Sequence, residues 1–235
     1  MLWRCEASKL PTQRYSYPTN RLSVQHMPTA NESPCQIPDD DRLFQRYHDK
    51  EWGLPITSVR ALFEKVCLEG FQSGLSWQII LHKRKAFRLA FDNFNIEKVA
   101  GYDEKRIEVL LANPEIVRNR RKIISAINNA ERAKELQAEF GSLKTFFWQF
   151  QPAGGRRPKK ITRAWLKKNP ICDESIAMAK ALKQRGWTFV GPTTLYALMQ
   201  ATGIVNDHVH NCPVRQAVER KRHAAGLCSE MRSEI

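Results

Sequence analysis

Apolar positions recur along the chain at the spacing of amphipathic helices, so the sequence predicts an all-α protein. In the stretch LFEKVCLEGFQSGLSW, which begins at Leu62, the residues Leu62, Val66 and Glu69 fall at i, i+4 and i+7. A helix carries all three on one face. Gly70 is expected to end this helix at its C′ position. A polar turn follows, and Trp77 begins the next apolar helix.

Glu69 is the unusual member of this face, because carboxylates are almost never fully buried unless they are paired. Its partner is expected to come from outside the helix. Glu69 and Trp77 then face each other across a turn that contains glycine. We interpret the pair as the floor of a pocket.

A helical hairpin is predicted further along the chain. Its first helix begins at Asp103 and is broken by Asn113-Pro114, and the second runs from Arg118 to about Glu139. Basic residues gather at the start of the second helix: Arg118, Arg120, Arg121 and Lys122. Exposed amides and arginines at a helix start suit a phosphate, which indicates a DNA-binding element. The alternative is a solvated helix start with no ligand.

The chain divides into three regions by composition. Residues 1–34 are rich in Ser, Thr, Pro and Arg, have no apolar period and are expected to be a disordered basic extension. Residues 35–213 form the predicted helical domain, and residues 214–235 form a basic C-terminal tail. Within the domain, residues 151–172 contain a strongly basic loop.

Charge and cysteine content narrow the class of protein. The 235 residues carry a net charge of +14, which indicates a polyanionic partner such as nucleic acid or, equally, a solubilising surface. The six cysteines are scattered rather than arranged as in a disulfide framework. No apolar run reaches the ~20 residues of a membrane span, and no signal peptide is evident. The sequence therefore predicts a cytoplasmic or nuclear protein with no membrane partner.

Four residues have the types and spacing of a metal site. Cys35 and His48 lie near the start of the predicted domain, and His208 and Cys212 lie at i and i+4 near its end. Two Cys and two His complete the tetrahedral shell of a structural zinc and leave no position for an activated water. Spacing alone equally allows two reduced cysteines and two surface histidines.

Three motifs resemble the DNA-3-methyladenine glycosylase I family: YHDKEWGLP at 47–55, CLEGFQSGLSW at 67–77 and RGWTFVGPTTLYALMQATGIVNDHVHNC at 185–212. The resemblance covers about three quarters of the chain. It implies an all-α, helix-hairpin-helix glycosylase-like domain in which a structural zinc joins the N- and C-terminal segments. The family's zinc ligands fall on Cys35, His48, His208 and Cys212.

The resemblance also implies the activity, which is hydrolysis of the N-glycosidic bond of 3-methyladenine in double-stranded DNA. The base-reading glutamate of the family falls on Glu69, and the pocket aromatics fall on Tyr47 and Trp77. No covalent lysine or metal-bound hydroxide is implied. Leu75, at the tip of the turn, is a candidate wedge for the gap left by a flipped base, or else plain core. We expect the protein to act as a monomer.

Two departures from the family pattern concern the pocket. Ile37 stands where the family has a tryptophan, and Phe44 stands where it has a tyrosine. They predict a less aromatic and less polar pocket with altered base selectivity. The alternative function is therefore a catalytically weakened or non-catalytic DNA-damage-binding protein of the same fold. A zinc hydrolase is a third reading, and it requires an open metal position.

Overall fold

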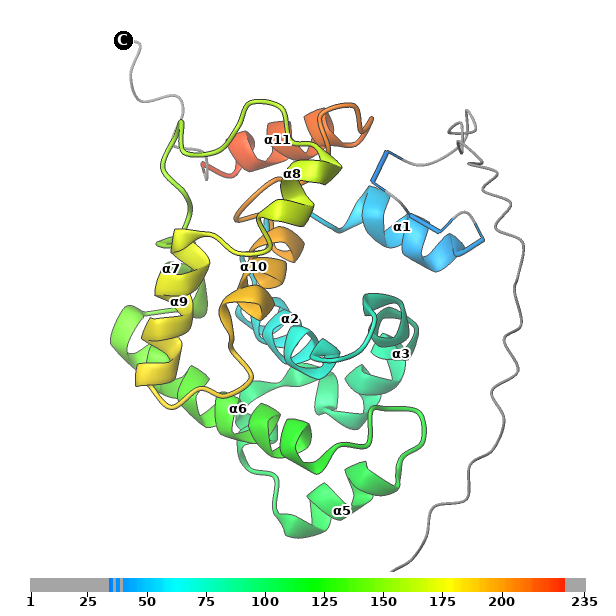
Figure 1. Ribbon diagram of the computed structural model, residues 1–235. Coiled ribbons are helices and arrows are strands. Elements are labelled where there is room, and N and C mark those ends of the chain that lie inside the picture. The colour runs from blue at the N-terminus through cyan, green and yellow to red at the C-terminus, as the bar shows by residue number, and fades with distance from the viewer. Residues whose placement is uncertain (1–33, 36, 39, 227–235) are drawn as a thin grey trace, which may run out of the picture. The chain divides into compact units, whose positions relative to one another are not determined.

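The computed structural model describes residues 34–35, 37–38 and 40–226, which fold into helices joined by short connections (Figure 1). In chain order the elements are α1 (Arg42–Lys50), α2 (Val59–Gln72), α3 (Trp77–Ala90), the 3₁₀ helix η1 (Asp92–Phe94), α4 (Ile96–Ala100), α5 (Glu104–Ala112), α6 (Arg120–Phe140), α7 (Leu143–Trp148), α8 (Arg163–Lys168), α9 (Asp173–Gln184), α10 (Pro192–Ala201) and α11 (Arg215–Ala224). These ranges contain no strand, which confirms the predicted all-α class. The predicted extension lies outside the described residues, apart from Pro34.

Helix α2 is the central element. It packs against α10, α6, α3 and α7, and Figure 1 shows it in cyan with α10, α3 and α6 around it. Every residue from Leu62 to Phe71 is buried, so the helix has no solvent face over this length. The charged residues Glu64, Lys65 and Glu69 are therefore inside the protein, where each needs compensation from neighbouring groups.

The end of α2 differs from the prediction. The helix continues past Gly70, which is not its C′ residue. The ammonium of Lys122 donates hydrogen bonds to the carbonyls of Phe71 (2.8 Å) and Ser73 (2.6 Å), and these bonds occupy acceptors that a helix end leaves free. The reversal comes instead at Gly74, whose φ of +78° is favourable for glycine.

The predicted helical hairpin is present as α5 and α6, joined by residues 113–119. Asp103 caps α5 by accepting a hydrogen bond from the backbone N–H of Arg106. The predicted basic tail needs correction, because its first part forms α11. The guanidinium of Arg222 is buried and donates to the carbonyls of Gly203 and Ile204, so the helical domain continues beyond residue 213.

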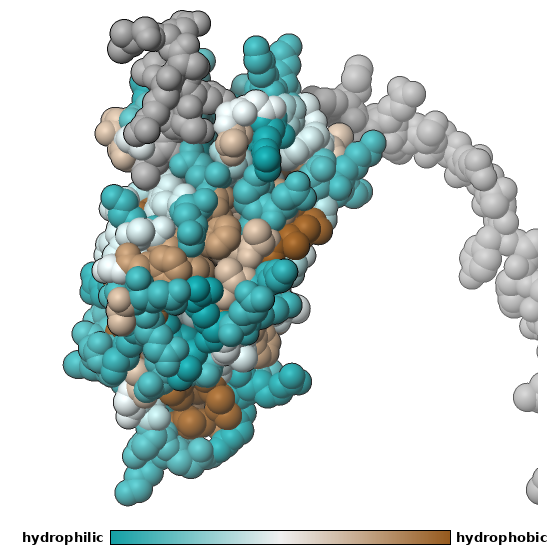
Figure 2. All heavy atoms as spheres, turned by 90° about the vertical axis from the view of Figure 1, so that its left-hand side faces the viewer, coloured by the Kyte–Doolittle hydropathy of each residue, from teal (hydrophilic) through white to brown (hydrophobic). Residues whose placement is uncertain are grey.

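The surface in Figure 2 is predominantly hydrophilic, and its apolar side chains gather in small separate areas. Among the described residues, no helix is both long and apolar enough to cross a membrane.

Candidate active site

A cavity of about 240 Å³ opens beside the central helix. Its walls come from α1, α2, α10, the first residue of α3 and the segment that precedes α1. The lining residues are Cys35, Ile37, Phe44, Tyr47, His48, Trp52, Glu69, Gln72, Trp77, Ala197 and Gln200. This size suits one small planar ring.

Two aromatic rings form one wall of the cavity. The centres of the Tyr47 and Trp77 rings lie 5.4 Å apart, with an interplanar angle of 43°. Local capping places both helices, because Asp41 caps α1 through the N–H of Phe44, and Ser76 caps α3. The two aromatics that the resemblance assigns to the pocket therefore lie beside each other in the structure.

Asp41 also ties the two aromatic-bearing helices together. Its carboxylate accepts hydrogen bonds from Gln78 Nε2 and His82 Nε2 on α3, each at 2.8 Å. The hydrogen bond from His82 is the main cause that lowers the pKa of Asp41 to about 2. A charged Asp41 thus holds α1 against α3 and brings Tyr47 to Trp77.

Glu69 lies in the same cavity and is 4% exposed. Within the described residues its carboxylate forms no hydrogen bond and no ion pair. Arg84, on α3, binds Glu51 and Glu64 instead. Burial raises the pKa of Glu69 to about 8, and the cation of Lys65 opposes this rise. The cavity therefore contains a buried acid without a direct partner beside two aromatic rings.

Of the other residues predicted for the pocket, two line the cavity and one does not. Ile37 and Phe44 line the cavity, so both departures from the family pattern face the space where a ligand would lie. Leu75 does not line it. Leu75 is instead 37% exposed in the turn between α2 and α3, where a neighbouring macromolecule can reach it.

The predicted metal ligands come together as one cluster. The ligand atoms of Cys35, His48, His208 and Cys212 all lie within 4.8 Å of one another. His208 Nδ1 is 3.0 Å from His48 Nε2, and Cys212 Sγ is 3.4 Å from His208 Nδ1. Burial lowers the pKa of His208 to about 4, so its ring is neutral, the form that binds a metal. The cluster could therefore hold a metal ion.

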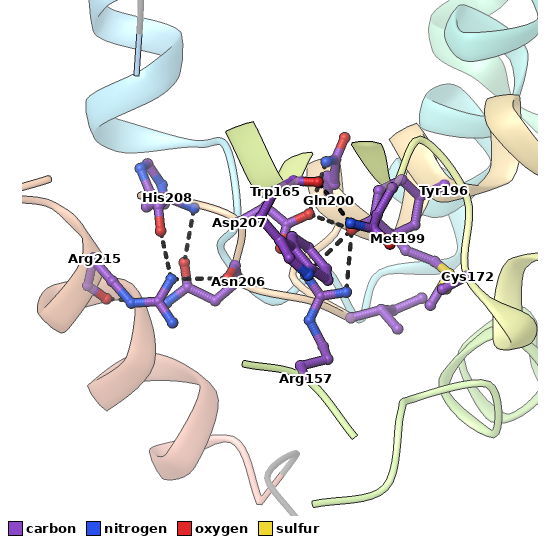
Figure 3. A network of polar contacts seen from close by, with 12 residues as sticks. Arg157, Trp165, Cys172, Tyr196, Met199, Gln200, Asn206, Asp207, His208 and Arg215 are labelled. Atoms are coloured by element: carbon purple, nitrogen blue, oxygen red, sulfur yellow. Dashed lines mark hydrogen bonds and ion pairs between the residues drawn. The ribbon is translucent and has the colours of Figure 1, made fainter. Parts of the chain in front are cut away.

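Sequence reasoning missed the polar network behind the cavity wall (Figure 3). Asp207 is 1% exposed and accepts hydrogen bonds from Tyr196 Oη (2.7 Å) and Gln200 Nε2 (2.8 Å). The guanidinium of Arg157 forms an ion pair with the same carboxylate. Because Gln200 lines the cavity, an arginine of the basic loop helps to fix the cavity wall. Only the adjacency of Asp207 to His208 signalled the network in the sequence.

The basic residues of the hairpin have different surroundings. Arg118 and Arg121 are exposed and form no ion pair among the described residues. Arg120 is paired with Glu104 and Glu108. Lys122 was expected to bind DNA, but it is only 8% exposed and its ammonium is bound to the carbonyls at the end of α2. Its position corrects that expectation, because a buried, occupied ammonium is not available to a phosphate.

The fold and the site together define a class: a small all-α protein with an aromatic cavity, a buried acid in it and a basic helical hairpin. Such a cavity can take a planar, electron-poor ring, whose charge the acid would balance.

The methyladenine glycosylase family model matches residues 37–216. DNA-3-methyladenine glycosylase 1 of Escherichia coli is 40% identical over 179 residues, which cover 76% of this chain and 94% of the relative. A crystal structure of a 3-methyladenine DNA glycosylase I has a TM-score of 0.71 at 40% identity, covering 77% of this chain and 98% of that one. A Tyr-to-Phe variant of such an enzyme, in complex with 3-methyladenine, has a TM-score of 0.70 at 31% identity, with coverages of 79% and 97%. The chain belongs to the methyladenine glycosylase family.

Proposed function

We propose that this protein excises 3-methyladenine from double-stranded DNA by hydrolysing the N-glycosidic bond, with Glu69 as the residue that reads the base. One observation carries the proposal: Glu69 is buried and has no direct partner in a cavity walled by Tyr47 and Trp77. The relatives named above for the same activity support it.

The substrate chemistry accounts for this arrangement. Methylation at N3 gives adenine a positive charge, so the base leaves as a neutral molecule when the bond to the sugar breaks. Water adds to the sugar carbon and loses a proton to solvent, and no acid is needed to protonate the leaving group. The enzyme must flip the nucleotide out of the helix, which costs about a few kcal/mol. A desolvated cation on the Tyr47 and Trp77 rings regains about 2 kcal/mol.

Glu69 provides the selectivity for a cationic base. Its carboxylate accepts hydrogen bonds from the adenine edge and balances the positive charge in a site with little water. Since burial raises the pKa of Glu69 to about 8, the empty site disfavours the ionised form, and an incoming cation favours it. Undamaged adenine is neutral and provides no such compensation. Catalysis then consists mainly of binding and orientation.

DNA contacts are proposed for two surfaces. Leu75 is exposed in the turn between α2 and α3 and is proposed to fill the gap left by a flipped base. Arg118 and Arg121 are exposed at the start of α6 and are proposed to contact phosphates. Lys122 is assigned a different role, which is to hold the turn that carries Leu75.

We further propose that the metal cluster holds one structural zinc. Ligand-atom separations of 3.0 to 4.0 Å are those of a compact N₂S₂ shell. The outer ring nitrogens are also engaged: His48 Nδ1 lies 2.7 Å from an Asp49 oxygen, and His208 Nε2 lies 3.0 Å from the Trp52 carbonyl. Such contacts fix the tautomer and ring orientation of ligating histidines. Four protein ligands leave no open position, which argues against a zinc hydrolase.

A second candidate function follows from Ile37 and Phe44, which make the cavity less aromatic and less polar than the family pattern. This candidate is a DNA-damage-binding protein that binds the lesion but excises the damaged base slowly or not at all. This candidate predicts tight binding to abasic-site duplexes together with little base release.

Base release from methylated DNA, resolved by product, decides between the two functions. We expect free 3-methyladenine from the wild type and a loss of about a hundredfold or more in Glu69→Gln, which keeps the shape and removes the charge. Glu131→Gln, an exposed position on α6, is the matched control and should retain the wild-type rate. Release by Glu69→Gln at the wild-type rate would refute the assigned site, and a wild type that releases nothing would select the binding function.

A further inference from the structure

Lys65 lies one turn before Glu69 on the central helix. The cation that acts on Glu69 therefore comes from its own helix, and the expectation of a partner from outside the helix is wrong. The side chain of Lys65 is 1% exposed, although lysine is almost never fully buried unless it is paired. Its Nζ lies 2.7 Å from Glu51 Oε1, 4.6 Å from the centre of the Tyr47 ring and 5.4 Å from that of Trp77. Lys65 does not line the cavity. It is a buried cation in contact with the rings of the cavity wall.

Glu51 has a second cationic partner besides Lys65. Arg84 Nη1 lies 2.7 Å from both carboxylate oxygens of Glu51, and Arg84 Nε also binds Glu64. Burial lowers the pKa of Lys65, and the carboxylate of Glu51 opposes that effect. Glu51 thus favours the charged form of Lys65, and Arg84 remains beside Glu51 when the lysine is removed.

Lys65, Glu51 and the residues linked to them by ion pairs form a cluster of charged side chains. The charges of this cluster balance only when Glu69 is included. Three cations meet two carboxylates in it: Lys65, Arg84 and Arg88 with Glu51 and Glu64. An ionised Glu69 supplies the third negative charge. Side chains at i and i+4 of a helix are neighbours, so Lys65 is the cation of this set that lies beside Glu69 along α2.

Among the described residues, the other elements packed around Glu69 offer it no second lysine or arginine. His48 of α1 lines the same cavity, and its Nε2 lies 3.0 Å from His208 Nδ1. From α1 Glu69 also faces Tyr47, a neutral phenol whose pKa is raised well above its ordinary value by burial and by that carboxylate. From α10 the cavity receives only Ala197 and Gln200. The ammonium of Lys122, on α6, is bound to backbone carbonyls.

We propose that Lys65 is a positioning residue that favours the ionised form of Glu69 in the cavity, and so sets the lower pH limit of base release. The proposal deepens the function proposed above and rests on it. Removal of the lysine charge leaves Glu69 buried with no neighbouring lysine or arginine. The protonated form of Glu69 then persists to higher pH. A protonated Glu69 does not balance the charge of a cationic base, and it cannot accept hydrogen bonds from the base edge at both oxygens.

The test is the pH profile of kcat/KM for 3-methyladenine release, after subtraction of the spontaneous rate, for the wild type and Lys65→Met. Methionine keeps the unbranched shape of lysine, and Arg84 still neutralises Glu51. We expect the acid limb of the profile to move up by about one pH unit, with about a tenfold loss at pH 7 that is recovered at high pH. Lys180→Met removes one exposed charge on α9 and should leave the limb in place. A purely structural role of Lys65 would lower the rate at every pH.

A second measurement needs no substrate. In protein labelled with ¹³C at the glutamate carboxyl, the Glu69 signal is assigned by its absence from Glu69→Gln and is titrated in the wild type and the Lys65 variant. Lys65→Gln, which removes the charge and keeps a polar end on the side chain, replaces Lys65→Met where the latter does not fold. An unchanged titration midpoint overturns the proposal. A shifted midpoint together with a wild type that releases no base leaves the role of Lys65 standing and rejects the proposed function.

Discussion

At the scale of single residues, the main feature is the buried carboxylate of Glu69. An acid whose pKa is raised on folding binds its proton more tightly in the folded state than in the unfolded state. Glu69 therefore destabilises the fold progressively as the pH rises from its ordinary value of 4.5 to about 8, and its effect is constant above that. The site gains a receptor for a cation at the expense of stability.

The residue-scale prediction is that Glu69→Gln is more stable than the wild type at pH 8.5. The difference in the free energy of unfolding should be small at pH 5 and grow to a few kcal/mol by order of magnitude at pH 8.5. Chemical denaturation at pH 5, 6.5 and 8.5 measures it. Glu131→Gln should follow the wild type at each pH, and a difference that does not vary with pH would contradict the assignment of the raised pKa.

At the scale of elements, the ammonium of Lys122 links the hairpin to the end of the central helix. The start of α6 carries Arg121 on the surface and Lys122 facing inward, where it ends α2 by binding the carbonyls of Phe71 and Ser73. Neighbouring basic residues thus serve different purposes, because successive residues of a helix point in different directions.

The element-scale prediction separates these two purposes. Lys122→Met should lower the free energy of unfolding by about 1–3 kcal/mol, because it leaves buried carbonyls without a donor, and should slow base release by loosening the turn. Arg121→Ala should leave stability unchanged and lower the slope of log K against log salt for DNA binding by about 1. Denaturation curves and salt titrations of duplex binding measure both effects. Equal salt slopes for the wild type and Arg121→Ala would remove that residue from the DNA interface.

At the scale of the whole molecule, residues distant in the sequence close the site. His48 follows Tyr47 directly and meets His208 at the far end of the domain, so the metal cluster holds an aromatic wall of the cavity in place. Arg157 adds a second long-range tie through Asp207 to Gln200.

The molecule-scale prediction concerns the metal. We expect one zinc per chain, and removal by a strong chelator should lower the melting temperature and abolish base release, because the segment that carries Tyr47 loses its anchor. Elemental analysis and melting curves with and without chelator provide the measurement. Cys212→Ser should lose the zinc. Cys172→Ser, which changes a cysteine outside the cluster and keeps a good N-cap for α9, should retain it. Full zinc content in Cys212→Ser would exclude the cluster as the site.

Local signals in the sequence were sufficient for the class of fold, the hairpin and the proximity of Glu69 to Trp77. Caps, prolines and apolar spacing act over a few residues, and the turn between α2 and α3 is short. The spacing of Cys35, His48, His208 and Cys212 alone did not decide whether they bind a metal. The resemblance to a known family identified them as one set of ligands. The four ligands come from the two ends of the domain, and they meet only through the tertiary fold, which local sequence rules do not determine.

Tertiary structure alone decided which charged side chains are available to bind a ligand or DNA. Among the described residues, Glu69 remains without a direct partner, whereas Glu51 and Glu64 are both paired with Arg84 from another helix. Whether Lys122 meets DNA or a carbonyl depends on how α6 packs against α2. The sequence determined which ionisable groups the chain carries and on which helices, whereas packing determined the partner of each, because a buried charge is governed by whatever neighbours lie within a few ångströms of it.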